Sequence, residues 1–151
     1  MTKVLATPGV YVEEKSGFSS SAVAVQTAVP AFVGFTEKAI RGRKSLINKP
    51  TRISSLGDFE ALFGGAPKTT FAISEDDQVG YKLEVDKPTL FYLHRSMRLF
   101  YTNGGGPCYI VSVGTYEDGL DAAKFNDLSN EGGIPALLKE PEPTMLVIPD
   151  A

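Results

Sequence analysis

The hydrophobic pattern singles out one apolar stretch, Ala28–Phe35, which reads AVPAFVGF. Six of its eight residues have apolar side chains, and β-branched and aromatic residues are among them. A short apolar run of this kind is typical of a strand buried on both faces. A buried helix is the alternative, but the run is short for one and Pro30 would interrupt its hydrogen bonding. We predict a central core strand that includes Val29, Phe32 and Val33.

Two helices are predicted by apolar residues that recur every three or four positions. The first is capped by Ser55, with Asp58 three positions later, and ends at Gly64-Gly65. The second is predicted to begin near Pro88, because the first turn of a helix tolerates proline, and to end at Asn103-Gly104. The apolar faces are Leu56, Phe59, Leu62 and Phe63 in the first helix, and Leu90, Leu93, Met97, Phe100 and Tyr101 in the second.

The second half of the chain adds two apolar strands, Cys108–Val113 and Met145–Ile148. Between them, Asp118–Ser129 is weakly helical and Ile134–Leu138 is a further helical turn. This order predicts an α/β fold, a mixed and largely parallel sheet with helices packed on it. The inward residues expected in the weak helix are Leu120, Ala123, Phe125 and Leu128.

The N-terminal pattern differs from that of the rest of the chain. After a turn signal at Thr7-Pro8-Gly9, the alternation of Val10, Tyr11, Val12 and Glu13 predicts a strand. A flexible linker is predicted next, with Ser16, Gly17, Ser19, Ser20 and Ser21. We therefore divide the chain into an extended arm and linker, residues 1–21, and an α/β core, residues 22–151. Such an arm can pair with its own sheet or add a strand to a neighbouring molecule.

Two polar segments invite a functional interpretation. Glu37–Arg52 contains Lys38, Arg41, Arg43 and Lys44, which suit an acidic partner, although a solvated loop explains them as well. Glu75-Asp76-Asp77 suggests calcium or magnesium, but the ligand spacing and the glycine of a calcium loop are missing, so a solvated turn is favoured.

Composition narrows the function classes. The 151 residues suffice for one domain with a core, and the net charge of −3 argues against nucleic-acid binding. The lone Cys108 forms no internal disulfide or metal cluster, which fits synthesis in a reducing compartment. Since no apolar run approaches the roughly 18 residues of a membrane span, we expect no direct membrane insertion.

The sequence contains no recognisable catalytic constellation, metal set or cofactor motif. His94 is the only histidine and lies within the predicted long helix, where a surface or core-edge position is the simpler interpretation. The glycines of Gly104–Pro107 follow a helix and precede a strand, the reverse of a phosphate-binding loop. We therefore expect neither an enzyme nor a cofactor.

Several stretches of the sequence form a set when they are taken in order: Thr7–Glu14, Thr27–Gly34, Pro50, Ile53–Ser55, Asp58–Phe59, Phe63–Gly64 and Phe100–Val111. Their order and spacing over most of the first 115 residues make the set more specific than any one stretch. The set resembles the tail sheath proteins of contractile phages and contractile injection systems.

The resemblance implies a structural subunit that forms hexameric rings stacked helically around an inner tube. Such sheaths stay extended and metastable until a baseplate triggers contraction, and their N-terminal segments cross to neighbouring subunits. The implied partners are other copies of the chain, the inner tube protein, and baseplate and terminal cap proteins. The implied setting is assembly in the bacterial cytoplasm, within a virion or particle that is later released.

Two further expectations complete the hypothesis. Sheath proteins usually have several hundred residues, so we expect this chain to be an N-terminal portion that lacks the C-terminal part; a native species near 16 kDa would contradict this. The alternatives are a small α/β ligand-binding module that uses Gly104–Pro107 and, less well supported, a hydrolase.

Overall fold

The computed structural model describes residues 28–76, 78–85 and 91–151, and for Asp76 and Val85 it describes the backbone only. The predicted arm, Val10–Glu13, and the linker, Ser16–Ser21, lie outside the described residues. So do the segment 22–27 and Pro88.

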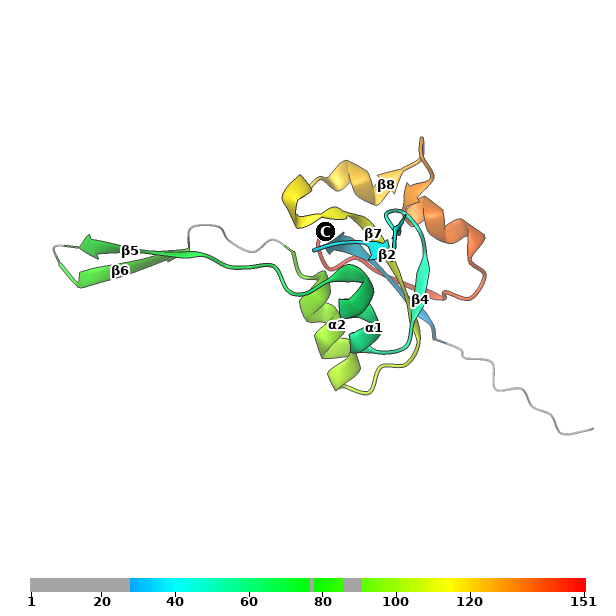
Figure 1. The fold of residues 1–151 in the computed structure, drawn as a ribbon, viewed down its shortest axis with the longest axis horizontal. Coiled ribbons are helices and arrows are strands. Elements are labelled where there is room, and N and C mark those ends of the chain that lie inside the picture. The colour runs from blue at the N-terminus through cyan, green and yellow to red at the C-terminus, as the bar shows by residue number, and fades with distance from the viewer. Residues whose placement is uncertain (1–27, 77, 86–90) are drawn as a thin grey trace, which may run out of the picture.

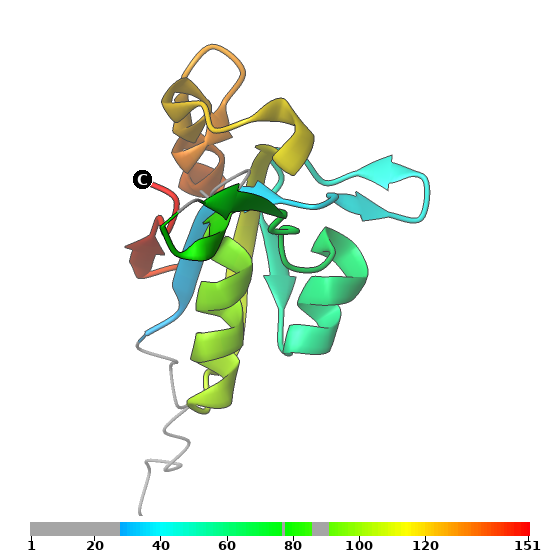
Figure 2. The ribbon, with the colours of Figure 1, turned by 90° about the vertical axis from the view of Figure 1, so that its left-hand side faces the viewer.

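A four-stranded sheet with strand order β10-β1-β7-β4 forms the centre of the molecule (Figures 1 and 2). Its inner strands are β1 (Pro30–Thr36) and β7 (Cys108–Thr115), which pair in parallel. The outer strands are β10 (Met145–Val147), parallel to β1, and β4 (Thr51–Ile53), antiparallel to β7. The predicted mixed, largely parallel α/β fold is confirmed. Its physical basis is that two apolar strands, each buried on both faces, pair in parallel at the centre of the sheet.

Two helices cover one face of this sheet. Helix α1 (Leu56–Phe63) and helix α2 (Leu93–Thr102) lie together below the sheet in Figure 1. The Ser55 side chain accepts a hydrogen bond from the Asp58 N–H at 3.0 Å, and Gly64 ends α1 with φ 87°, as the sequence predicts. Their buried residues form one core with the sheet, comprising Phe32, Ile53, Phe59, Phe63, Leu93, Met97, Cys108 and Ile110.

The opposite face is covered by short 3₁₀ turns rather than by the predicted weak helix. These are η1 (Tyr116–Asp118), η2 (Ala122–Phe125) and η3 (Ile134–Lys139), with the small pair β8 (Asn126–Asp127) and β9 (Gly132–Gly133) between the last two. Phe125 is buried as predicted, but Leu120, Ala123 and Leu128 are exposed, so the expectation for these three was wrong. A short 3₁₀ segment presents fewer side chains to the sheet than an α-helix of several turns, and therefore buries fewer of them.

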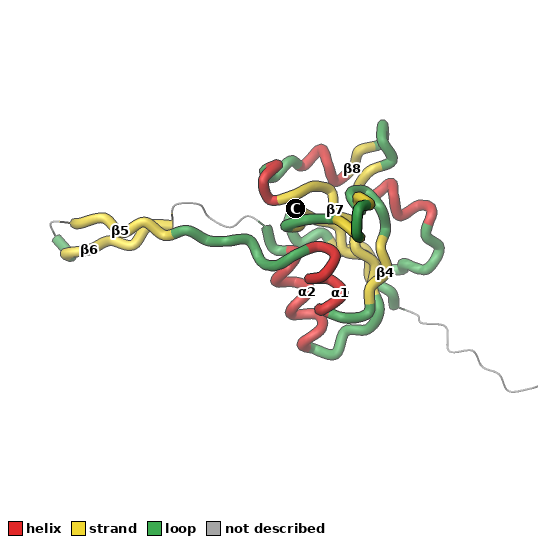
Figure 3. Tube along the Cα trace, viewed as in Figure 1, coloured by secondary structure: helices red, strands yellow, loops and turns green. Residues whose placement is uncertain are grey.

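Two hairpins extend from this body. The predicted loop Glu37–Arg52 contains β2 (Ile40–Arg41) and β3 (Lys44–Ser45), joined by a turn in which Gly42 has φ 61°. The longer hairpin pairs β5 (Phe71–Asp76) with β6 (Gly80–Val85) and projects well away from the sheet (Figure 3). The polar composition of the first segment concealed its strands, and strand β4 at its end was missed as well.

Asp150 decides where helix α2 begins. Its carboxylate accepts hydrogen bonds from the N–H groups of Tyr92 (2.5 Å) and Leu93 (3.1 Å), and from that of Phe35 in β1 (2.8 Å). A Cβ at Gly34 would lie 2.6 Å from the Asp150 Oδ2 atom, so only glycine permits this approach. Helix α2 therefore begins at Leu93 rather than near Pro88, because a carboxylate from the other end of the chain caps it there.

Candidate assembly surface at the open edge of the sheet

Strand β10 forms an open edge of the central sheet. Its three residues pair only with β1, in the register Pro30↔Met145, Ala31↔Leu146 and Phe32↔Val147. Within the described residues its outer main-chain groups therefore have no partner strand. The sequence predicts an apolar strand inside a sheet here, but Met145 and Leu146 are 53% and 46% exposed. An unpaired edge with apolar side chains favours the addition of another strand.

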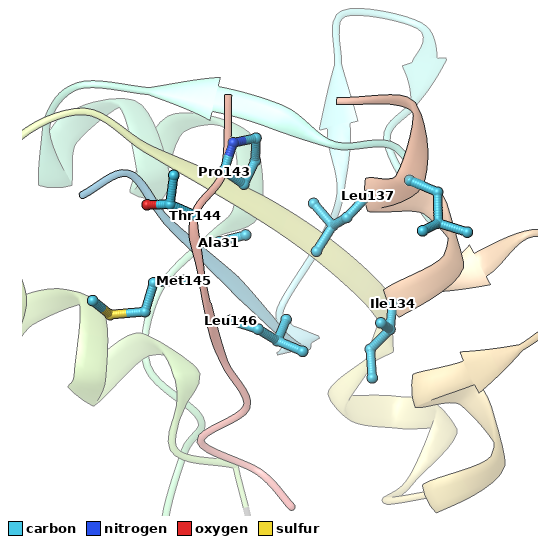
Figure 4. Close-up of a pocket in the computed structure, with 8 residues that line it drawn as sticks. Ala31, Ile134, Leu137, Pro143, Thr144, Met145 and Leu146 are labelled. Carbon is cyan, nitrogen blue, oxygen red and sulfur yellow. The ribbon is translucent and has the colours of Figure 1, made fainter. Parts of the chain in front are cut away.

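An apolar groove follows this edge on the side of η3. Figure 4 shows Leu146 and Ile134 facing each other across it, with Leu137 on the same wall as Ile134. The groove has a volume of about 270 Å³, and none of the described residues that line it is charged. Leu138, also at the groove, is 87% exposed. The described residues that line the groove are Ala31, Ile134, Leu137, Leu138, Pro143, Thr144, Met145 and Leu146.

Hydrogen bonds hold both ends of β10 in place. Before the strand, the Val29 N–H donates to Thr144 Oγ1 at 3.1 Å, and the Thr144 N–H donates to the Val29 carbonyl at 2.9 Å. After the strand, Asp150 binds the main chain of β1 and α2 as described above. A short strand at an edge would otherwise fray, so these bonds fix the position of β10.

A second polar cluster fixes the segment that enters β10. Glu142 accepts hydrogen bonds from the Tyr109 hydroxyl (2.6 Å) and from the Arg52 guanidinium (3.2 and 3.3 Å). The Tyr109 hydrogen bond, followed by that of Arg52, lowers the pKa of the Glu142 carboxyl. The bond to Glu142, together with burial, raises the pKa of Tyr109 to about 12. The cluster joins the strands β4 and β7 to the chain before β10.

Three of the predicted site residues lie in the core of the sheet. Phe32 and Val33 lie in β1 and Val29 directly precedes it, with 5%, 0% and 1% of their surfaces exposed. These residues position the open edge from within the core. The arm Val10–Glu13 and the linker residues lie outside the described part of the chain, so their roles stay predictions.

The residues considered for chemistry occupy structural positions. His94 is buried, and its Nε2 lies 3.4 Å from Glu60 Oε1, which links α2 to α1. Cys108 is buried with its Sγ 3.3 Å from the Tyr101 hydroxyl, and burial raises the pKa of its thiol. In the part of the chain that the structure describes, no three His, Cys, Asp or Glu residues are grouped to hold a metal ion. Neither described α-helix is long and apolar enough to cross a bilayer.

The loop Gly104–Pro107 connects α2 to β7, as predicted. A cavity of about 450 Å³ lies beside it, lined by Phe32, Ser96, Leu99, Phe100, Asn103, Gly104 and Gly105. The described residues that line this cavity carry no charge, and the Asn103 amide donates to the Leu99 carbonyl at 2.7 Å. These contacts do not add support for the ligand-binding alternative.

Sequence reasoning missed Asp150 and the cluster around Glu142. No sequence signal pointed to Asp150, because only the structure shows that α2 begins at Leu93, where Tyr92 provides no side-chain cap. The contacts of Glu142 had no such signal either, because Arg52 and Tyr109 are distant from it in sequence and only the sheet brings them together.

No protein-family model matches the sequence, and no curated protein is detectably similar to it. Among solved structures, the chain is similar to the helical sheath of the anti-feeding prophage (AFP) in its contracted state, determined by cryo-EM. The identity is 28% over 96% of this chain, with a TM-score of 0.49. The chain spans about a third of the length of that sheath chain, 32%.

Proposed function

We propose that this chain belongs to the structural subunit of a contractile sheath, of a phage tail or a contractile injection system. Subunits would form stacked hexameric rings around an inner tube, assembled in the bacterial cytoplasm, and would contract when a baseplate releases them. The role is mechanical rather than enzymatic. The partners are other copies of the chain, the tube protein, and baseplate and cap proteins.

The observation that carries the proposal is where the family-like stretches lie in the fold. Of the stretch Thr27–Gly34, the described residues 28–34 lead into and form much of β1, and Phe100–Val111 forms the end of α2, the glycine turn and the start of β7. The shorter pieces at Ile53–Ser55, Asp58–Phe59 and Phe63–Gly64 build the end of β4 and both ends of α1. Stretches that are weak individually in the sequence thus meet in one sheet and its two helices.

The open edge of β10 supports the mode of assembly. Strand addition links subunits through main-chain hydrogen bonds, and a flexible connection then allows their bodies to rotate and repack. We propose that Val10–Glu13 acts as such a strand on a neighbouring copy, joined to its own body by the linker Ser16–Ser21. The exposed Met145 and Leu146 make β10 the apolar acceptor edge in the described part of the chain.

Negative-stain electron microscopy of the purified native product tests the proposed class. Striated tubes or stacked rings are the expected result. Monodisperse particles from the native product would reject the sheath role and make a ligand screen at the cavity beside Gly104 the next step.

Proline variants test the arm. Val10→Pro or Val12→Pro removes a main-chain donor from the added strand, so tubes should be lost while far-UV circular dichroism of the body stays unchanged. Val12→Thr is the matched control, because threonine keeps both the donor and the β-branched shape. Normal tubes from both proline variants would exclude strand exchange without excluding a sheath.

A further inference from the structure

The long hairpin has one apolar face that the described chain leaves uncovered. In its antiparallel register Ile73 lies opposite Leu83, and Glu75 lies opposite Tyr81, so these side chains share a face with Phe71. The exposed fractions of Phe71, Ile73, Tyr81 and Leu83 are 58%, 73%, 71% and 64%. The other face is polar and carries Ser74 and the Lys82–Glu84 ion pair at 2.8 Å.

A hairpin of this kind is poorly stabilised by itself. An isolated two-stranded hairpin is marginal in water and needs a further layer on its apolar face. Figures 1 and 3 show β5 and β6 extending away from the sheet and both helices, so the body of the same chain does not supply that layer. A contiguous exposed apolar face on a projecting element marks an interaction surface.

Charge complementarity identifies the partner. The carboxylate of Glu75 is exposed near the tip of the hairpin. The short β2–β3 hairpin carries the opposite charge, because Arg41, Arg43 and Lys44 are all exposed. Within the described residues none of these three cations is in an ion pair. The basic side of the β2–β3 hairpin borders a hollow of about 410 Å³. The residues that line this hollow include Arg41, Lys44, Leu46, Lys49, Pro50 and Arg52.

We propose that the apolar face of the β5–β6 hairpin is an interface between copies of this chain, with Glu75 near its tip against the basic β2–β3 hairpin of a second copy. The inference rests on the proposed self-assembling function and adds a contact separate from the N-terminal arm. The two surfaces differ, so the contact is heterologous. Repeated from copy to copy, such a contact closes into a ring or continues as a helix, the symmetries that a sheath needs.

Matched substitutions on the two hairpin faces test the apolar part. Ile73→Ser should weaken self-association in sedimentation velocity by roughly tenfold or more, the effect of losing one buried apolar side chain from an interface. Ala72→Ser, one residue away on the polar face, should leave association unchanged. Because Ile73 is exposed, neither change should alter the thermal unfolding of the body.

Charge reversal tests the partner. Glu75→Lys and Arg43→Glu should each weaken association, and an equimolar mixture of the two variants should restore it, because each then meets an opposite charge. Association that survives Ile73→Ser and both reversals would overturn the inference, and so would a parent chain that stays monomeric at all concentrations. Striated tubes from Ile73→Ser would also overturn the hairpin interface while leaving the sheath role intact. Absence of tubes from the native product would instead count against the sheath role itself.

Discussion

Asp150 is the residue whose replacement should reveal most about how this fold is held together. Its buried carboxylate accepts three main-chain hydrogen bonds, one from β1 and two from the N-terminus of α2. In Asp150→Asn one side-chain oxygen remains as an acceptor. The NH₂ group of the new amide then faces at least one of these main-chain N–H groups, and two donors cannot bond to each other. The variant therefore loses a charge-assisted bond, leaves a buried donor unpaired, and removes the negative charge from the start of the helix.

The expected loss of stability follows from these contributions. A hydrogen bond to a charged group contributes about 1.5–3 kcal/mol, and a charge at a partly buried helix terminus contributes up to ~2 kcal/mol. Because the contributions overlap, we expect Asp150→Asn to reduce the free energy of unfolding by roughly 3 kcal/mol, a large part of the 5–15 kcal/mol typical of a domain. The midpoint of thermal unfolding should fall by roughly 10 °C for a chain of this size.

Urea unfolding followed by far-UV circular dichroism and tyrosine fluorescence measures this change, since the chain has six Tyr and no Trp. Asp121→Asn is the matched control: Asp121 caps the short turn η2 at an exposed position, where asparagine caps equally well. A loss below about 0.5 kcal/mol for Asp150→Asn, similar to that of surface changes, would refute the reasoning.

Two further predictions concern the cap of α1 and the Glu142 cluster. Ser55→Ala should reduce stability by about 1 kcal/mol, whereas Ser55→Asn should be nearly neutral, because the Asp58 N–H needs an acceptor; equal losses in urea unfolding would contradict the capping role. The phenol of Tyr109 should titrate near pH 12, and Glu142→Gln should bring its pKa down toward the ordinary value of 10. Since the folded-state pKa is the higher one, this contribution to stability is complete below pH 10 and is lost as the pH rises through about 12. Ultraviolet difference spectra of phenolate formation check the shift, and a titration unaffected by Glu142→Gln would exclude the hydrogen bond as its cause.

The local sequence pattern was sufficient to predict the elements whose structure is determined by their own residues. The apolar run around Phe32 and Val33 predicted a doubly buried strand, and the capping pair Ser55 and Asp58 predicted the start of α1. In both cases neighbouring residues supply the physical cause, through side-chain burial or a hydrogen bond within one turn. The parallel pairing of the later strands followed from the order of elements along the chain.

Tertiary structure decided the features that depend on partners distant in sequence. The start of α2 depends on Asp150, more than fifty residues later, and the exposure of β10 depends on its place at the edge of the sheet. Phe71 and Ile73 stand at alternate positions of the sequence, as do Tyr81 and Leu83. Only the fold shows that the described residues leave their shared face uncovered. A periodic pattern specifies which side chains lie on one face, whereas the packing of the whole chain determines what covers that face.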